Sequence, residues 1–555
     1  INATSATGVL VEDSTLKTAA NISVKDNSIA VSAKNSKVEV GKGLYNINSK
    51  SIAFKITDLK ANNYFKGISG TLNLGDNSIA YHIKNSNLTS ANFIDNLTVN
   101  STGKYTYLYA ENSTLNYENQ KTINSDDSIF IYGKNSDITL EGKADISSNN
   151  KKVTAIYSDK NFINKGKIDL SGESSIGVYA TGGTVDLKNN SQLSVKNNDS
   201  TLVYYDGKNG NIINNTDKLN IGESSYGFIV KGVNNKLESN STGTVALKNN
   251  SIFMYSKDIA GSISNKTNIT SSGNENYGIY SSGKVDNYGN IDFSLGKGSI
   301  GMYAYYPKED RYTVMGPATP VPIVTNHGTI KVAKTSLSGK NETYGIGMAA
   351  GYTENIKEVR ADGSTITTVI QKATGHIVNR GLISVMAPNS IGMYATGRGS
   401  IAENFGRIEI GGSSRNIGMY LENGAVGYNY GTITTVGSNN VGQVGVAVTT
   451  GARIVNAKNA TIKINADGGI GIYNFGGGIV ENYGTISVDE TSTDIKTLDQ
   501  ADTSKGIGGV RIQVREDDKS QADIFVNGRK VQPTLVHTIP NRAPSEIPTS
   551  SIGIY

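Results

Sequence analysis

The sequence contains no cysteine and no tryptophan, and only 9 of its 555 residues are proline. Without cysteine there can be no disulfide framework and no thiolate metal site, a composition common in long secreted bacterial chains. No apolar run approaches the roughly 18 residues that a helix needs to cross a bilayer, so we expect no direct membrane insertion in this segment. The chain opens at Ile1 without a leader, and we expect a processed or truncated piece.

Charged residues are also scarce. Asp, Glu, Lys and Arg make up 18% of the chain, and the formal net charge of +5 is spread along it without basic blocks. Nucleic-acid-binding proteins concentrate basic residues on one face or stripe, so we expect no nucleic-acid partner. Asn, Ser, Thr and Gly are abundant instead, and such a polar composition alone would suggest disorder. The apolar residues are regularly spaced, which argues against disorder.

One five-residue motif recurs along the chain. Its clearest copies are SIGVY at 175–179, NYGIY at 276–280, SIGMY at 299–303 and 390–394, NIGMY at 416–420, GIGIY at 469–473 and SIGIY at 551–555. Degenerate copies begin near Ser28, and the copies between Ile29 and Ile300 lie about 25 residues apart. Such a period indicates stacked repeats of one small unit.

A second motif, Asn-x-Gly-x-Ile with an aromatic or basic second residue, follows the first. Its copies start at residues 164, 287, 326, 379, 404, 429 and 482. A stacked Asn can hydrogen-bond to the next coil, and we expect the Gly to take a positive φ at a corner. The Tyr that ends the first motif alternates away from the core, which predicts an exposed or corner-stacked ladder.

Each period thus holds three short alternating strands and no helical pattern. Three such strands close into a coil of about 25 residues, which predicts an all-β, right-handed parallel β-helix (solenoid) interrupted by surface loops. We expect regular coils at 1–304, an inserted loop at 305–325, coils at 326–488 with a second inserted loop near 352–374, an excursion with a Pro-rich segment at 489–549, and the start of a further coil at 550–555, where the chain is truncated.

The inserted loops are the candidate functional features, because insertions in a solenoid leave it at the surface. In the first loop, the candidate partner-binding residues are Tyr305, Tyr306, Arg311 and Tyr312, since aromatic and Arg side chains are enriched at interfaces. The alternative is a loop that packs on its own coils.

We identify no catalytic, cofactor-binding or metal-binding residue. The four histidines, His82, His327, His376 and His537, fall at unrelated positions, and His327 fills the aromatic place of the second motif. There is no P-loop, HExxH or GxSxG motif, and the carboxylates are single and scattered rather than clustered as in glycan-cleaving β-helices.

The SIGMY and NYGTI repeats resemble the passenger regions of large fusobacterial monomeric (type V) autotransporter adhesins, the RadD-like proteins and their galactose-binding relatives. The resemblance extends over nearly the whole chain. It implies continuation to a C-terminal outer-membrane β-barrel and display at the bacterial cell surface or secretion. It also implies non-catalytic binding of partner bacteria (coaggregation), of host glycans or of protein receptors, with a role in virulence. A carbohydrate-active β-helix enzyme and a purely mechanical stalk stay open as alternatives.

Overall fold

The computed structural model describes residues 2–3, 7–60, 62–307, 321–336, 343–359, 363–413 and 415–489, and three short strands at 512–513, 536–537 and 552–554. These residues form strands, turns and bends, and none of them is helical. Up to residue 489 the chain divides into two compact units, one ending at Ser241 and the other beginning at Thr242. Within each unit, strands of successive coils pair in parallel with a spacing of about 25 residues, which confirms the predicted β-solenoid. Its right-handedness stays a prediction.

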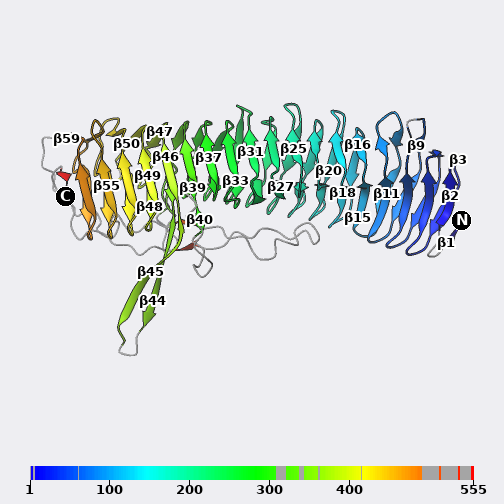
Figure 1. Ribbon diagram of the computed structural model, residues 1–555, viewed down its shortest axis with the longest axis horizontal. Coiled ribbons are helices and arrows are strands. Elements are labelled where there is room, and N and C mark those ends of the chain that lie inside the picture. The colour runs from blue at the N-terminus through cyan, green and yellow to red at the C-terminus, as the bar shows by residue number, and fades with distance from the viewer. Residues whose placement is uncertain are drawn as a thin grey trace. The chain divides into compact units, whose positions relative to one another are not determined.

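The first unit has strand ladders on three sides of the coil, and one of them is continuous (Figure 1). The continuous ladder contains β2 (Thr7–Glu12), β5 (Ile29–Lys34), β8 (Ile52–Thr57), β11 (Ser78–Lys84), β15 (Tyr105–Glu111), β18 (Ile129–Lys134), β21 (Thr154–Ser158), β24 (Ile176–Ala180), β27 (Thr201–Lys208) and β30 (Tyr226–Val233). The second side holds β3 (Thr15–Thr18), β6 (Lys37–Val40), β9 (Tyr64–Gly67) and β13 (Phe93–Asp95), then β12 (Asn87–Leu88), β16 (Thr114–Tyr117), β19 (Asp137–Leu140), β22 (Phe162–Asn164), β25 (Thr184–Leu187), β28 (Asn211–Asn214) and β31 (Lys236–Ser239). The third side holds β1 (Asn2–Ala3), β4 (Ile22–Val24), β7 (Leu44–Ile47), β10 (Thr71–Leu74) and β14 (Thr98–Ser101), then β17 (Gln120–Ile123), β20 (Asp145–Ser148), β23 (Lys167–Leu170), β26 (Gln192–Val195) and β29 (Leu219–Ile221).

The coil at 78–104 is where the ladders of the first unit change. Its strand β11 pairs with both β8 and β15, so the first side is uninterrupted. On the second side, β13 pairs back with β9, whereas β12 pairs forward with β16. On the third side, β14 pairs back with β10, and in this described stretch no ladder joins β14 to β17. The cross-section of the solenoid therefore changes at this coil.

The second unit has one ladder on each of its three sides. The first contains β33 (Ile252–Ser256), β36 (Tyr277–Ser281), β39 (Ile300–Ala304), β43 (Ile346–Ala350), β48 (Ile391–Thr396), β51 (Ile417–Glu422), β54 (Val444–Thr449), β57 (Ile470–Phe475) and β62 (Ile552–Ile554). The second contains β34 (Ser262–Asn265), β37 (Lys284–Asn287), β41 (Ile323–Asn326), β46 (His376–Asn379), β49 (Ile401–Asn404), β52 (Val426–Asn429), β55 (Arg453–Asn456) and β58 (Ile479–Asn482). The third contains β32 (Thr244–Leu247), β35 (Asn268–Ser271), β38 (Ile291–Asp292), β42 (Thr329–Lys331), β47 (Leu382–Val385), β50 (Arg407–Ile410), β53 (Thr432–Thr435), β56 (Thr461–Asn465) and β59 (Thr485–Asp489). A short antiparallel pair, β60 (Ile512–Gln513) and β61 (Val536–His537), lies outside these ladders.

Apolar side chains fill the interior by stacking on the equivalent residue of the next coil. In the second unit a buried row of methionines runs through four coils, because Met348 pairs with Met302 and Met393, and Met393 pairs with Met419. One coil alone cannot bury its apolar face, so each coil depends on its neighbours for stability.

The Asn of the second motif forms a buried ladder of side-chain amides in the second unit. Each Nδ2 donates to the Oδ1 of the next Asn, at 2.7–3.1 Å, through Asn265, Asn287, Asn326, Asn379, Asn404, Asn429, Asn456 and Asn482. All but the last of these residues are buried. A buried amide must have hydrogen-bond partners, and stacking gives each one a donor on one side and an acceptor on the other. The predicted role of this Asn is confirmed.

The expected positive φ at the Gly of the second motif is wrong. Gly289, Gly328, Gly381, Gly406 and Gly431 all lack it. Their constraint is close approach between coils: a Cβ at Gly406 would lie 2.2 Å from the carbonyl oxygen of Gly381. No side chain fits at that distance, so this position requires glycine for space rather than for its dihedral freedom.

The tyrosine ladder of the first motif is stacked as predicted, but much of it is buried rather than exposed. Ring centroids of Tyr157 and Tyr179 lie 5.6 Å apart, and those of Tyr179 and Tyr204 lie 5.0 Å apart. Tyr303 and Tyr394 of the second unit are completely buried. The expectation of exposure fails there because other residues of the unit, described below, cover these two tyrosines.

Replacing Asn404 with alanine is expected to lower the free energy of unfolding of the second unit by about 2–3 kcal/mol, because Asn379 Nδ2 loses one acceptor and the buried Asn429 Oδ1 loses its side-chain donor. Urea unfolding followed by circular dichroism measures this change. Lys458→Ala, at an exposed position of a neighbouring coil, is the control and should have almost no effect. Equal stability of the two variants would contradict a stabilising role for the amide ladder.

Candidate interaction surface

An antiparallel insertion leaves the second unit where β43 ends. β44 (Tyr352–Val359) and β45 (Thr365–Thr374) form a hairpin, and the start of β40 (Tyr306–Pro307) pairs with the end of β45. Gly363 supplies a φ of 78° at the turn, and β45 is rich in the β-branched residues that favour strands. Figure 1 shows the hairpin standing out from the coils of its unit. The stretch near 352–374, expected as an inserted loop, is therefore regular secondary structure.

Four tyrosines pack together where the hairpin joins the coils, and we call them the aromatic root: Tyr280, Tyr303, Tyr305 and Tyr352. Ring centroids are 5.8 Å apart for Tyr280 and Tyr305, and 6.3 Å apart for Tyr305 and Tyr352. The Tyr303 hydroxyl donates to the carbonyl oxygen of Gly351 at 3.0 Å. The other members of the aromatic root therefore pack around Tyr303, and its hydrogen bond ties the coil to the start of the hairpin.

The four candidate partner-binding residues occupy different places. Tyr305 is half-buried in the aromatic root, and Tyr306 lies on β40, where its backbone pairs with Thr374. Arg311 and Tyr312 lie outside the described residues. Contact with a partner stays a prediction for all four.

A second cluster at the base of the hairpin is polar and is centred on the buried Glu422 at the end of β51. Its carboxylate accepts hydrogen bonds from the hydroxyls of Tyr394 at 2.5 Å and Tyr420 at 3.1 Å. The neighbouring Asn423 donates to Thr353 Oγ1 of the hairpin and to Thr396 Oγ1 of the coil, at 3.1 and 3.0 Å. We call this cluster the polar root: Thr353, Tyr394, Thr396, Tyr420, Glu422 and Asn423. Tyr394 and Tyr420 are buried within it.

Burial raises the pKa of the Glu422 carboxyl to about 7, although hydrogen bonds from Tyr394, Tyr420 and Thr396 partly oppose the shift. Among the described residues, no basic side chain contributes to this pKa. The buried group therefore changes charge near neutral pH.

A row of exposed aromatic and basic side chains follows one corner of the second unit. It comprises the second residue of successive Asn-x-Gly motifs, and we call it the corner row: Tyr288, His327, Arg380, Phe405, Tyr430 and Tyr483. Ring centroids of Tyr288 and His327 are 4.6 Å apart, as are those of Phe405 and Tyr430, and the Arg380 guanidinium lies 4.6 Å from the Phe405 centroid. Tyr483 is 66% exposed.

The side chains of the corner row point outward because the residues on either side of each one leave no room for it inside the coil. The Asn before it is committed to the buried amide ladder, and the Gly after it touches the backbone of the preceding coil. The aromatic or basic second residue of this motif is visible in the sequence, but we predicted no function for it. Its recurrence beside a buried Asn was the signal that could have marked a surface row.

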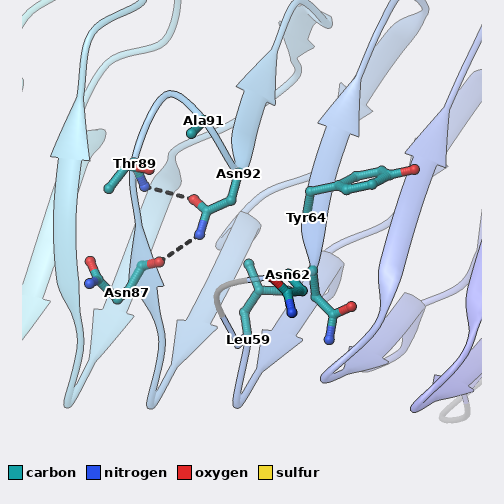
Figure 2. A pocket seen from close by; sticks show the side chains of 8 residues that line it. Leu59, Asn62, Tyr64, Asn87, Thr89, Ala91 and Asn92 are labelled. Carbon is teal, nitrogen blue, oxygen red and sulfur yellow. Dashed lines mark hydrogen bonds between the residues drawn. The ribbon is translucent and has the colours of Figure 1, made fainter.

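The first unit has a pocket of about 480 Å³ beside the coil where its ladders change. Its walls come from Leu59, Asn62, Asn63, Tyr64, Asn87, Thr89, Ala91 and Asn92. Figure 2 shows that the Asn92 side chain bridges the loop, accepting from the Thr89 N–H at 2.7 Å and donating to the Asn87 carbonyl at 2.8 Å. These are the two backbone groups that a strand placed alongside would bind in a parallel ladder. Asn92 therefore closes the open edge of β12.

Histidines and carboxylates meet only in pairs in the described part of the chain. His82, His327 and His376 lie 3.8, 3.3 and 2.9 Å from carboxylates of Glu111, Asp286 and Glu403. Among the described residues there is no group of three or more His, Asp or Glu side chains placed to hold a metal ion. Nor do these residues include a helix that is long and apolar enough to cross a membrane.

Part of the chain is similar to a known family of β-solenoid domains. Residues 294–432, about a quarter of the chain, match the family model described as the BigA third pectate lyase-like domain. No curated protein and no solved structure matches the chain. The matched stretch contains the hairpin, the polar root, the aromatic root except for Tyr280, and four members of the corner row, Arg380 among them.

The raised pKa of Glu422 predicts that the second unit loses stability as pH rises. Between about pH 4.5 and pH 7 the folded state holds a proton that the unfolded state releases, so the free energy of unfolding should fall by roughly 3 kcal/mol across this window. Glu422→Gln should remove this dependence, whereas Glu409→Gln, at a partly exposed position, should retain it. Urea unfolding at half-unit pH steps tests this, and an unchanged slope in Glu422→Gln would contradict it.

Replacing Asn92 with alanine is expected to destabilise the first unit by about 1–2 kcal/mol, since Asn87 and Thr89 each lose a hydrogen bond. Asn62→Ala, on the exposed wall of the same pocket, is the matched control and should be neutral. Limited proteolysis within the loop at 89–92 measures the same change locally, and equal cleavage of both variants would contradict the edge-closing role.

Proposed function

We propose that this chain is the passenger of a bacterial surface adhesin of the autotransporter type, which binds partner bacteria, host-cell glycans or protein receptors without catalysing a reaction. BigA, whose third pectate lyase-like domain is similar to residues 294–432, is an adhesin of this type. The resemblance of the repeats to RadD-like fusobacterial passengers supports the same role, with type V secretion and display at the outer membrane. A solenoid suits it, because stacked coils make a scaffold from which insertions project.

The observation that carries the proposal is the hairpin β44–β45. A two-stranded hairpin is marginally stable alone in water, so one that projects needs support at its base. Here the aromatic root and the polar root supply that support, through Tyr303 bonded to Gly351 and Asn423 bonded to Thr353. A scaffold that only separates two ends of a molecule has no use for such a supported projection.

The corner row offers a second contact surface in the same unit. Aromatic residues and Arg are enriched where proteins bind one another, and they contribute much of the binding energy. Phe405 and Tyr430 are each 41% exposed and stack on one another, so their positions are fixed before binding. Prior ordering reduces the entropy that association costs.

Cleavage of a polysaccharide is the second candidate function. The observation that favours it is the pectate lyase-like description of the matched family. Incubating the purified chain with acidic and neutral polysaccharides and measuring reducing ends and unsaturated products tests it. Turnover that survives re-purification would replace the adhesin proposal.

Binding of the purified chain to intact bacteria and to epithelial and immune cells tests the proposed function. We compare the native chain with a variant in which residues 353–372 are replaced by two glycines, so that Tyr352 and Ala373 keep their places at the root. Saturable binding that falls at least tenfold in this variant is expected, with galactosides and free arginine as competitors.

Two single substitutions serve as a matched pair. Val369→Asp places a charge on the hairpin, where Val369 is 44% exposed, and should weaken binding. Val233→Asp makes the same change in the first unit, where Val233 is 51% exposed, and should not. Equal binding by all variants would exclude the hairpin as the contact surface, and no binding by the native chain would leave this segment a stalk.

A further inference from the structure

A buried Asp and Lys face one another where the ladders of the first unit change. Asp95 ends β13, Lys121 lies on β17 of the next coil, and the Lys121 Nζ is 3.3 Å from Asp95 Oδ2. The Asp95 side chain is completely buried and that of Lys121 is 12% exposed. Lys121 Nζ also donates to the Leu97 carbonyl at 2.8 Å, which holds the nitrogen at the carboxyl group. The contact joins two coils that have no backbone ladder between them on the third side, where Lys121 lies.

Aromatic side chains enclose this pair and supply hydroxyl donors. The Tyr81 hydroxyl donates to Asp95 Oδ1 at 2.8 Å, and the Tyr107 hydroxyl donates to Oδ2. The rings of Tyr81 and Phe93 lie 5.3 Å apart, and the Lys121 Nζ lies 5.4 Å from the Tyr107 centroid. Burial, the largest cause, raises the pKa of the Asp95 carboxyl, although Lys121 opposes the shift.

We propose that Asp95 and Lys121 condense into an intramolecular amide (isopeptide) bond that links the coil at 78–104 covalently to the next one. The inference does not depend on the proposed function. It names a modification site that forms within the folded chain, from two side chains that the fold itself brings together.

The reaction needs no reagent beyond the two side chains. The lysine proton first moves to the carboxylate, which leaves a neutral amine and a carboxylic acid. The nitrogen then attacks Cγ of Asp95, one C–N bond forms, and the C–Oδ2 bond breaks. Oδ2 leaves as water, with the acid proton and one proton from nitrogen, and nothing is oxidised or reduced.

The surroundings favour this condensation in three ways. The Lys121 Nζ is held 3.3 Å from Asp95 Oδ2, an oxygen bonded to the carbon that the nitrogen attacks, so no bimolecular encounter is needed. The hydroxyls of Tyr81 and Tyr107 polarise the carboxyl group and stabilise the negative charge that develops on its oxygen. Two buried charges become one neutral amide, which removes the desolvation penalty of the ion pair.

The mass of the intact, denatured native chain tests the proposal. The expected mass is lower than the sequence mass by one water molecule, and a protease digest should contain one branched peptide that joins residue 95 to residue 121. A chain at its full sequence mass would overturn the proposal. Because the native chain alone decides the result, a variant that fails to fold does not affect it.

Two controls locate the bond. Lys121→Arg cannot form this amide and should have its full sequence mass, so a loss of water that persists in this variant would also overturn the proposal. Asp137 and Lys160 make the same contact between coils, with Oδ2 and Nζ 2.7 Å apart, but their side chains are 36% and 45% exposed. Their peptides should be recovered unlinked, and a cross-link there would contradict the role assigned to burial.

Discussion

The distance between neighbouring strands of a parallel ladder, about 4.8 Å, limits which side chain each position of this chain can carry. A residue on the ladder lies directly beside its own copy in the next coil, so a repeated charge would face a like charge. A repeated amide has the opposite property, because one end of Asn404 donates to the next coil while the other accepts from the previous one. This constraint accounts for a chain that is poor in charge and rich in Asn.

The same constraint explains where chemically distinct residues gather. They lie at positions where a residue does not have to stack on its own copy in the next coil. These positions are the corner, where Arg380 can project, and the places where the ladders change or an insertion leaves the coil. Asp95 is buried at the coil where two ladders change, and Glu422 is buried at the base of the hairpin. Breaks in the repeat are thus the places where this fold can hold a buried carboxylate.

The period, the three short strands and the stacked Asn could be predicted from the sequence, because each leaves a repeated trace in it. The reason for Gly406 could not, because its constraint is the carbonyl of Gly381 in the preceding coil, a contact with no local signature. The hydrogen bond from the Tyr303 hydroxyl to the Gly351 carbonyl joins residues 48 positions apart, so it has no local signature either. The change of ladders at 78–104 could not be predicted from the sequence for a different reason. That coil has about the same length as the others, so the period of the repeat does not reveal it.

The partners of the two buried carboxylates, rather than their depth, decide what each can do. Glu422 receives hydrogen bonds from hydroxyls, and no basic group of the described residues contributes to its pKa, so its charge is removed by taking up a proton, which is reversible. Asp95 faces the amine of Lys121, so its charge can also be removed by a covalent bond, which is permanent. A reversible group suits the base of a projecting hairpin. A permanent one suits two coils that lack a ladder on one of their three sides.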